Sequence, residues 1–328
     1  MGAISFRQLG MLVLALVCVT SVQARETLTV GLIAHGEEQE AIAAWQPVLD
    51  DLAKATGANV KAVAAKNYAQ ILDGLKSGQI QVARLGNKVA LEAVETANCD
   101  VFAQLVLKGG VDKYSSVLIT RKDSGIQDFA QVLGNKARYR YGSGDKKSTS
   151  GFLLPQYYAF LKNNIVVDQH FKTVRYGNHQ DNFLAVAKGE VDVAANNTDD
   201  LLKFSKKFPK ESSNIKVIWQ SEAFNFDPMV MRRNLPAQLK QDISKFFLEY
   251  GKSSVYPDAV AKLIAADDLS GFKALANRDL KRIAEVELFY AQFSAALNPA
   301  LSPAQRQQID KANFRRHEQL IALLGGAR

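Results

Sequence analysis

The sequence LKSGQIQVA at residues 75–83 returns in similar form as VAKGEVDVA at residues 186–194. In both copies a helical pattern ends at a glycine, and a strand with alternating apolar residues follows. Polar turns come next, RLGN at 84–87 and ANNTDD at 195–200. The repeat indicates two similar halves with a shared cleft, because α/β sheets bind ligands at the carboxyl ends of their strands. Ordinary helix-to-strand connections would give the same pattern, so the repeat alone leaves both interpretations open.

Strand and helix patterns alternate along most of the remaining chain. LTVGLI at 28–33 predicts a buried strand, and the apolar spacing of residues 41–57 predicts the helix after it. Two successive strand-like runs, DVFAQLVLK at 100–108 and YSSVLITRK at 114–122, interrupt the alternation, which then restarts. Beyond Pro236 the pattern is nearly all helical. This order predicts an α/β protein whose parallel strands are covered by helices.

The first 24 residues form a separate unit in the sequence. Arg7 is their only charge, and an apolar stretch runs from Leu9 to Val19. The sequence Val-Gln-Ala at 22–24 then resembles the cleavage site of a signal peptidase. These features predict a signal peptide that is cleaved near Ala24. A retained membrane anchor is the less favoured alternative, because the apolar stretch is shorter than the roughly 18 residues of a typical span.

Composition narrows the class of partner. The chain of 328 residues has a formal net charge of +8, and a basic surface favours anionic partners. The basic residues are scattered and form no long run, so we expect no nucleic-acid partner. Once the first 24 residues are removed, Cys99 is the only cysteine. It therefore cannot form an internal disulfide, and we expect a buried free thiol.

The stretch GDKKSTSGFLLP at 144–155 carries three consecutive hydroxyl residues but fits no enzyme motif. A P-loop needs a glycine directly before its lysine, where this chain has Lys146. No G-x-S-x-G elbow surrounds the serines. The histidines, at 35, 170, 179 and 317, are too dispersed for a metal motif. A triad of distant residues stays open at this point. We expect no enzyme, no catalytic residue, no metal and no cofactor.

A binding role for the hydroxyl run has a direct physical basis. Ser148, Thr149 and Ser150 stand directly before an apolar segment with helical spacing. Hydroxyls there can cap the helix, and together with the first backbone N–H groups they can hold a tetrahedral oxyanion. The alternative is that one residue caps the helix while the other two are solvated. Pro155 lies inside the helical pattern and predicts a kink or an irregular first turn.

Three longer segments carry a family resemblance. STSGFLLPQYYAFLKNNI at 148–165, AVAKGEVDVAANNTDDL at 185–201 and KVIWQSEAFNFDPMVMRRNL at 216–235 closely resemble the periplasmic phosphonate-binding proteins of ABC importers. The likeness extends over nearly all of residues 26–260. It implies a type II periplasmic binding protein, a location in the periplasm, and an ABC transporter permease in the inner membrane as the partner.

The resemblance also implies the domain organisation. Two α/β lobes are expected, joined by a two-strand hinge with the ligand cleft between them. The first lobe would comprise residues 25–117 and 226–328, and the second residues 118–225. Ligand binding closes such lobes by a hinge motion. The apolar stripes of the last helices more often pack on their own lobe than on a partner, and a homodimer through these C-terminal helices is the alternative.

Seven ligand-binding residues follow from the resemblance. Hydroxyls of Ser148, Thr149 and Ser150 would hold the phosphonate oxygens, and Tyr68 of the first lobe would donate a further hydrogen bond. Asp199 and Asp227 would receive the amino group of 2-aminoethylphosphonate, and His179 would lie near the cleft. Local sequence offers plainer roles for the two acids. Asp199 could be a helix cap, and Asp227 a turn residue before proline.

One departure from the family pattern bears on ligand identity. Where the family has W-Y-G-N with a tyrosine that contacts the phosphonate, residues 84–87 read RLGN. Leu85 would then remove one donor, and Arg84 would compensate only if it turned inward, which strict strand alternation opposes. We expect 2-aminoethylphosphonate as the ligand. The alternatives are phosphite, methylphosphonate or phosphate, and less favoured ones are an enzyme or a sensory binding component on the same scaffold.

Overall fold

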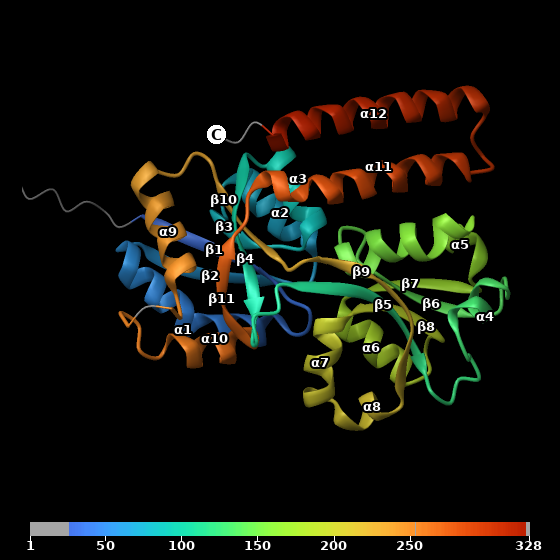
Figure 1. The fold of residues 1–328 in the computed structure, drawn as a ribbon, viewed down its shortest axis with the longest axis horizontal. Helices are drawn as coiled ribbons and strands as arrows, with labels where there is room; N and C mark the ends of the chain where they lie inside the picture. Colours follow the sequence, from blue (N-terminus) through green and yellow to red (C-terminus); the bar gives the residue numbers. More distant parts are fainter. Residues whose placement is uncertain (1–25, 253, 326–328) are drawn as a thin grey trace, which may run out of the picture.

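The computed structural model describes residues 26–252 and 254–325, so the predicted signal peptide at 1–24 lies outside the described residues. The chain folds around two separate β-sheets, each covered by helices, and two long C-terminal helices lie along one side (Figure 1). The predicted α/β architecture with two halves is confirmed.

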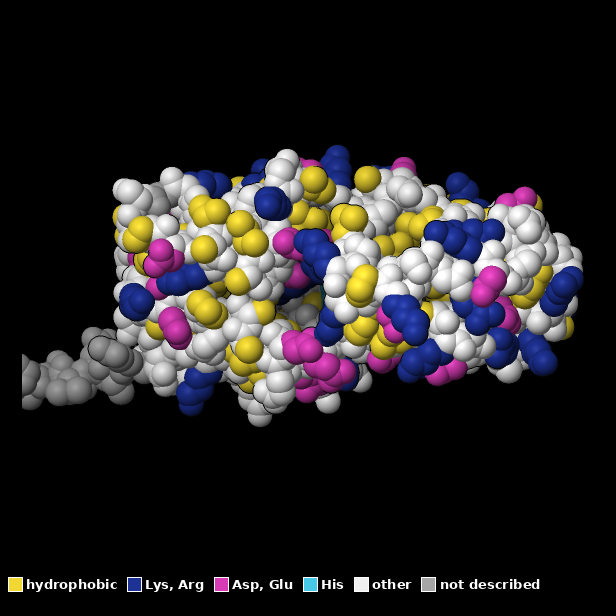
Figure 2. Space-filling view, turned by 90° about the horizontal axis from the view of Figure 1, so that it is seen from below, with side chains coloured by type: hydrophobic (Ala, Val, Ile, Leu, Met, Phe, Trp, Pro, Cys, Tyr) yellow, Lys and Arg dark blue, Asp and Glu magenta, His cyan; other side chains and the backbone are white. Residues whose placement is uncertain are grey.

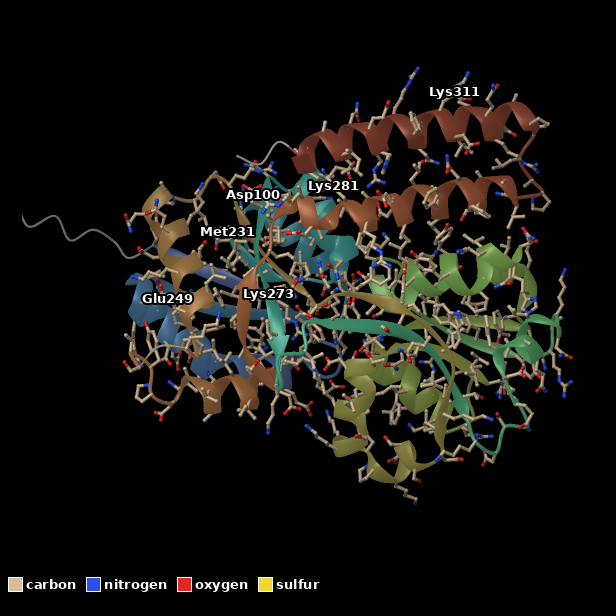
Figure 3. All side chains as sticks on the ribbon, in the orientation of Figure 1. Asp100, Met231, Glu249, Lys273, Lys281 and Lys311 are labelled. Atoms are coloured by element: carbon tan, nitrogen blue, oxygen red, sulfur yellow. The ribbon has the colours of Figure 1, made fainter. Side chains whose placement is uncertain are left out.

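The first sheet has the strand order β11-β4-β10-β3-β1-β2. Its strands are β1 (Thr27–Ile33), β2 (Asn59–Ala65), β3 (Val82–Arg84), β4 (Cys99–Leu107), β10 (Pro228–Arg232) and β11 (Leu269–Ala274). Its helices are α1 (Glu38–Thr56), α2 (Tyr68–Ser77), α3 (Asn87–Thr96), α9 (Ala237–Glu249) and α10 (Ala259–Asp267). Figure 3 shows Asp100, Met231 and Lys273 on three neighbouring strands of this sheet, β4, β10 and β11.

The second sheet has the order β7-β6-β8-β5-β9. Its strands are β5 (Lys113–Arg121), β6 (Arg140–Gly144), β7 (Thr173–Gly177), β8 (Val193–Asn197) and β9 (Ile215–Asn225). Its helices are α4 (Phe129–Leu133), α5 (Val167–His170), α6 (His179–Ala187), α7 (Thr198–Lys207) and α8 (Pro209–Ser213), with the π-helical segments η1 (Thr149–Leu153) and η2 (Pro155–Phe160) and the 3₁₀ turn η3 (Leu161–Asn163). The irregular helix predicted from Pro155 is confirmed by the two π-helical segments.

The chain passes between the sheets twice, from β4 to β5 and from β9 to β10. We propose that the lobes divide at these two crossings, and we call the parts built on the first and second sheets lobe 1 and lobe 2. The whole of β5 pairs within the second sheet, so the boundary expected between residues 117 and 118 falls inside that strand.

The sequence repeat corresponds to a structural repeat. β3 pairs in parallel with β1 and antiparallel with β10, and β8 pairs in the same way with β6 and β5. Gly78, before β3, has a φ of 79°, and Gly189, before β8, has a φ of 72°. A residue with a side chain would be strained in this left-handed conformation. Each strand then leads into a helix, α3 or α7. The polar turns thus occupy equivalent places in the two lobes.

The C-terminal helices α11 (Lys281–Ala296) and α12 (Pro303–Gly325) follow the 3₁₀ turn η4 (Asn277–Leu280) and form an antiparallel hairpin. Ile283 and Val286 of α11 are buried in a core that also contains Leu153 and Tyr157 of lobe 2. α11 therefore packs against both lobes (Figure 1). Lys311 of α12 is exposed and lies on the outer side of the hairpin (Figure 3).

Cys99 is a buried free thiol, as the sequence predicts. Within the described residues, none of the helices combines the length and the apolar character that crossing a membrane requires.

Candidate functional site

A small cavity lies between the lobes, where the two repeated turns meet the two crossings. Its volume is about 10 Å³, and we call its walls the cradle. Residues of lobe 1, of or beside the crossings, and of lobe 2 form these walls, namely His35, Tyr68 and Gly86, then Tyr114, Phe226 and Asp227, then Thr149, Ser150, His179, Asn197 and Asp199. Six of the seven residues expected at the site are among them. Ser148 lines an adjoining cavity together with Tyr68 and His179.

The three hydroxyl residues are all buried. Ser148 caps η1 by accepting the N–H of Gly151 at 3.0 Å. The Ser150 hydroxyl lies 3.3 Å from Nε2 of His179 and accepts a bond from Nδ2 of Asn197 at 3.5 Å. The interpretation in which two of the three hydroxyls are solvated is therefore wrong, and the run is an internal polar surface.

Thr149 reaches across to the other lobe. Its Oγ1 accepts a hydrogen bond from the backbone N–H of Lys88, in the first turn of α3, at 2.8 Å. A second bond between the lobes runs nearby, from the N–H of Gln180 to the carbonyl of His35 at 3.1 Å. These contacts join the two lobes at the edge of the cradle, so both lobes shape it.

Two tyrosines bring phenol groups to the same place. Tyr68 begins α2, whose cap is Asn67, and Tyr114 stands at the start of β5, just after the first crossing. Burial raises the pKa of both phenols, so each hydroxyl keeps its proton and can donate it to an anion. Tyr114 shares the cradle wall with the hydroxyl residues Thr149 and Ser150.

Tyr114 was not identified from the sequence. The corresponding hydroxyl donor was expected at position 85, where this chain has leucine. The Leu85 side chain is fully buried in the core that includes Val89 of α3, and it does not line the cradle. A hydroxyl at position 85 would therefore face the core, and the expected loss of a donor from the site is wrong. No motif marks Tyr114. The only signal is its position at the first crossing.

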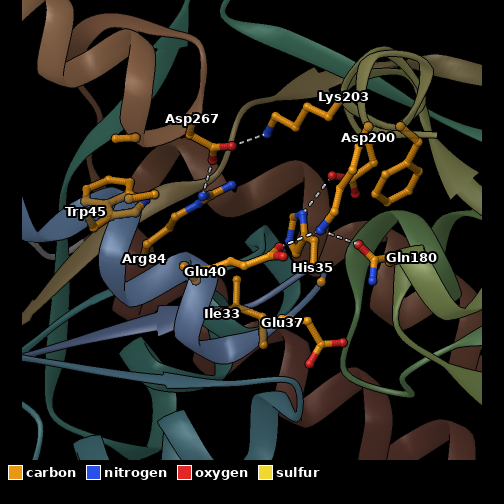
Figure 4. A pocket seen from close by; sticks show the side chains of 16 residues that line it. Ile33, His35, Glu37, Glu40, Trp45, Arg84, Gln180, Asp200, Lys203 and Asp267 are labelled. Carbon is orange, nitrogen blue, oxygen red and sulfur yellow. Dashed lines mark hydrogen bonds and ion pairs between the residues drawn. The ribbon is translucent and has the colours of Figure 1, made fainter. Parts of the chain in front are cut away.

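Arg84 lies on the opposite face of β3 from Leu85, as strand alternation predicts, and its buried side chain points at two acids. Its Nε donates to Oδ2 of Asp227 at 3.2 Å, and its Nη1 pairs with Asp267 at the end of α10. The guanidinium lies 6.0 Å from the ring centre of Trp45 (Figure 4). Ala83 and Leu85 pack in one core, whereas Val82 and Arg84 lie on the other face beside Trp45, so alternation holds to the end of β3.

The two acidic residues expected to receive an amino group each have a basic partner. Asp227 pairs with Arg84, and Oδ2 of Asp199 lies 2.6 Å from Nζ of Lys203. The helix cap of α7 is Asn197, whose Oδ1 accepts the N–H of Asp200 at 2.8 Å. The interpretation of Asp199 as the cap is therefore wrong, and its carboxylate is free to line the cradle.

Burial and neighbouring charges shift several pKa values. Burial raises the pKa of Asp199 to about 6, and the nearby acids Asp200 and Asp267 add to this against the opposing effect of Lys203. Burial also lowers the pKa of His179 to about 4, so its imidazole is neutral near pH 7. For His35 the Asp200 carboxylate, 3.1 Å away, outweighs burial and raises the pKa.

The order Ser150, His179 and Asp200 superficially matches a catalytic triad. The second link fails, because Nδ1 of His179 lies 4.0 Å from Asp200 and has no hydrogen-bond partner among the described residues. An imidazole with a pKa of about 4 is also a poor general base at neutral pH. Within residues 26–252 and 254–325, no group of three or more potential ligands could hold a metal ion.

An outer cavity of about 200 Å³ lies next to the cradle. Arg84, Lys203 and Asp267 line it together with Glu37 and Glu40, and Figure 4 shows them around the opening. From below, the surface is hollowed between the two halves of the molecule, with acidic and basic side chains at the rim (Figure 2). The outer cavity thus joins the cradle region to this hollow.

Comparison with known proteins assigns the family. Residues 30–280 match the model of the family described as ABC transporter, phosphonate, periplasmic substrate-binding protein. The phosphonates-binding periplasmic protein of Escherichia coli K12 is 38% identical over 280 residues, which cover 85% of this chain and 81% of that protein.

Solved structures agree with this assignment. A binding-protein component of an ABC phosphonate transporter from Pseudomonas aeruginosa is 34% identical, with a TM-score of 0.84 over 90% of this chain and 97% of that one. A Prochlorococcus marinus protein solved with methylphosphonate has a TM-score of 0.68 over 80% of this chain and 97% of that one, and at 21% identity it supports the fold alone.

The fold expected from the resemblance, a type II periplasmic binding protein, is confirmed by these neighbours. The relatives bind substrates for transport, so the expectation that the chain is not an enzyme is also confirmed. With two lobes, a polar cradle between them and a family match over most of its length, this chain belongs to the periplasmic phosphonate-binding proteins of ABC transporters.

Proposed function

We propose that the chain captures 2-aminoethylphosphonate in the periplasm and delivers it to an ABC importer. The observation that carries this choice is a charge excess beside the cradle. Among the described residues, the carboxylates of Asp199, Asp227 and Asp267 pair with two cations, Arg84 and Lys203. The neighbouring buried Asp200 has His35 as its own partner. One ammonium group would balance the cluster, and an unpaired buried charge is costly.

The phosphonate end of the ligand would lie at the hydroxyl run. Ser148, Thr149 and Ser150 offer hydroxyls, and the protonated phenols of Tyr68 and Tyr114 offer two further donors. Hydrogen bonds to a charged group contribute about 1.5–3 kcal/mol each. Neutral His179 adds a polar contact beside Ser150 without adding charge.

The ammonium end would lie between the two carboxylates. Asp199 and Asp227 both line the cradle, and each uses Oδ2 for its basic partner. No described residue donates a hydrogen bond to Oδ1 of Asp227, which leaves this oxygen for a ligand. An ammonium group has three donors and can bind more than one carboxylate oxygen.

Titration calorimetry with 2-aminoethylphosphonate and ethylphosphonate tests the proposal, because the two ligands differ only in the amino group. We expect 2-aminoethylphosphonate to bind at least about 10-fold more tightly, which corresponds to ~1.4 kcal/mol. Methylphosphonate, phosphite and phosphate complete the series. Equal affinity for ethylphosphonate or methylphosphonate would refute the amino-group argument and favour a receptor for simple oxyanions.

The role in transport requires export and a permease. We propose that the mature chain starts near Arg25, and N-terminal sequencing of protein from the periplasmic fraction checks this. Stimulation of the ATPase activity of an ABC phosphonate transporter by the ligand-bound protein would distinguish delivery from a purely sensory role. Ile283 and Val286 are buried against the chain itself, so a homodimer through the C-terminal helices would use exposed side chains such as Phe289 of α11 and Phe314 of α12. Sedimentation velocity measures the oligomeric state.

A further inference from the structure

The two carboxylates that line the cradle are the ends of one chain of alternating charges. Arg84 joins Asp227 to Asp267, and Lys203 joins Asp267 to Asp199. Each oxygen of Asp267 serves one cation, Oδ2 for Arg84 and Oδ1 for Lys203. We call these five residues the charge chain, and Figure 4 shows its middle part.

The charge chain crosses from one lobe to the other at a single link. Arg84, Asp227 and Asp267 belong to lobe 1 or to the second crossing, and Asp199 and Lys203 belong to α7 of lobe 2. The contact between Lys203 and Asp267 is therefore made only when α7 and α10 approach one another. Closure of the lobes completes the charge chain.

The members of the charge chain are shielded from water. Side-chain exposure is 6% for Arg84, 7% for both Asp199 and Asp227, 14% for Asp267 and 21% for Lys203. Charges in such surroundings interact more strongly than surface pairs. Losing one central member should therefore affect the carboxylates at both ends.

We propose that Arg84 is a specificity-determining positioning residue, which acts through Asp227 and Asp267 so that the positive group of the ligand is recognised when the lobes are closed. The planar guanidinium holds two carboxylates from separate segments, the second crossing and the end of α10, and a lysine could not span both with the same geometry. The inference rests on the proposed function, since it assumes a ligand with one ammonium group.

The experiment compares the ratio of the dissociation constants of ethylphosphonate and 2-aminoethylphosphonate in three variants. Asp267→Asn removes the central acid, and Arg84→Lys keeps the charge but loses the fork. Asp268→Asn is the matched control, because Asp268 is the next residue and pairs with the exposed Lys206, outside the charge chain. Thermal melts of each variant show that it is folded.

We expect Asp267→Asn and Arg84→Lys each to lower the ratio at least about 10-fold, and Asp268→Asn to leave it within about 3-fold. Should Asp267→Asn fail to fold, Arg84→Lys carries the test alone. An unchanged ratio in the folded variants overturns the inference, and so does an equal fall in Asp268→Asn, which would reveal only long-range charge. A ratio near one in the unmodified protein would instead refute the proposed function.

Discussion

Thr149 Oγ1 accepts the backbone N–H of Lys88 at 2.8 Å, so one hydroxyl of lobe 2 is fixed on the first turn of a helix of lobe 1. The same side chain lines the cradle. A group placed in this way can contribute both to the contact between the lobes and to the contact with an oxyanion.

Thr149→Val should therefore weaken every oxyanion ligand. The substitution keeps the shape of the side chain but removes the hydroxyl, and loss of a bond to a charged group costs about 1.5–3 kcal/mol, or one to two decades in affinity. Titration calorimetry with 2-aminoethylphosphonate and phosphite measures the effect. Thr96→Val, at the exposed end of α3, is the control and should bind normally. Normal binding by Thr149→Val would remove Thr149 from the site.

Tyr114→Phe should weaken phosphonate binding by about 10-fold or more, because the phenol that burial keeps protonated is a donor within the cradle. Tyr158→Phe is the matched control, since the Tyr158 hydroxyl binds Glu222 near the surface. Titration calorimetry measures the phosphonate affinity of both variants. Equal affinities in the two would mean that Tyr114 only packs against Phe226, whose ring centre lies 5.2 Å away.

Asp199→Asn should reduce affinity for 2-aminoethylphosphonate in a pH-dependent way. The pKa of Asp199 is raised to about 6 from an ordinary value of 3.8, so the carboxylate is ionised above that pH and protonated below it. An ammonium ligand favours the ionised form. The affinity ratio of unmodified to variant protein should be largest above pH 7 and shrink below pH 6.

Protonation of the phosphonate itself cancels in this comparison, because both proteins bind the same ligand. The linked stability has the opposite sign. A raised folded-state pKa gives stability that is fully present below pH 3.8 and is lost as the pH rises to about 6. Thermal melts without added ligand should show this loss in the unmodified protein and not in Asp199→Asn. A pH-independent affinity ratio would contradict the assignment of the carboxylate.

Leu85→Ala should lower stability and spare ligand binding. Leu85 is fully buried in the core beside α3, and removing such a side chain typically costs about 2–5 kcal/mol. Denaturant unfolding measures this, and Leu202→Ala, on the exposed face of α7, should change little. A large loss of affinity in a still-folded Leu85→Ala protein would return position 85 to the site.

The sequence predicted the parts of the site that depend on local order. The repeat placed its two polar turns in equivalent positions because each follows a glycine and a strand in the same order. The hydroxyl run could be placed at a helix start because apolar residues with helical spacing follow it directly. Strand alternation correctly put Arg84 on the face opposite Leu85, but it could not show that the Leu85 face is core and does not line the cradle.

The remaining residues came from contacts that local patterns do not encode. Arg84 and Asp267 are 183 positions apart, and only the tertiary fold brings them together. Tyr114 lies at the start of β5, just after the first crossing, where no motif marks a ligand-binding tyrosine. The identity of the seven expected residues depended on the resemblance, whereas their electrostatic partners required the three-dimensional structure.

Helix α11 contacts both lobes away from the cradle, so its side chains can influence the equilibrium between open and closed forms. Tyr157 stacks on Phe289 and meets Phe293 edge-on, with ring centres 5.8 and 5.9 Å apart. The hinge motion expected of the two lobes would slide these aromatic rings over one another, so the rings would contribute to the free-energy difference between open and closed forms. That difference enters the apparent affinity for any ligand that binds the closed form. Sequence drift along α11 can therefore retune phosphonate capture while every residue of the cradle stays the same.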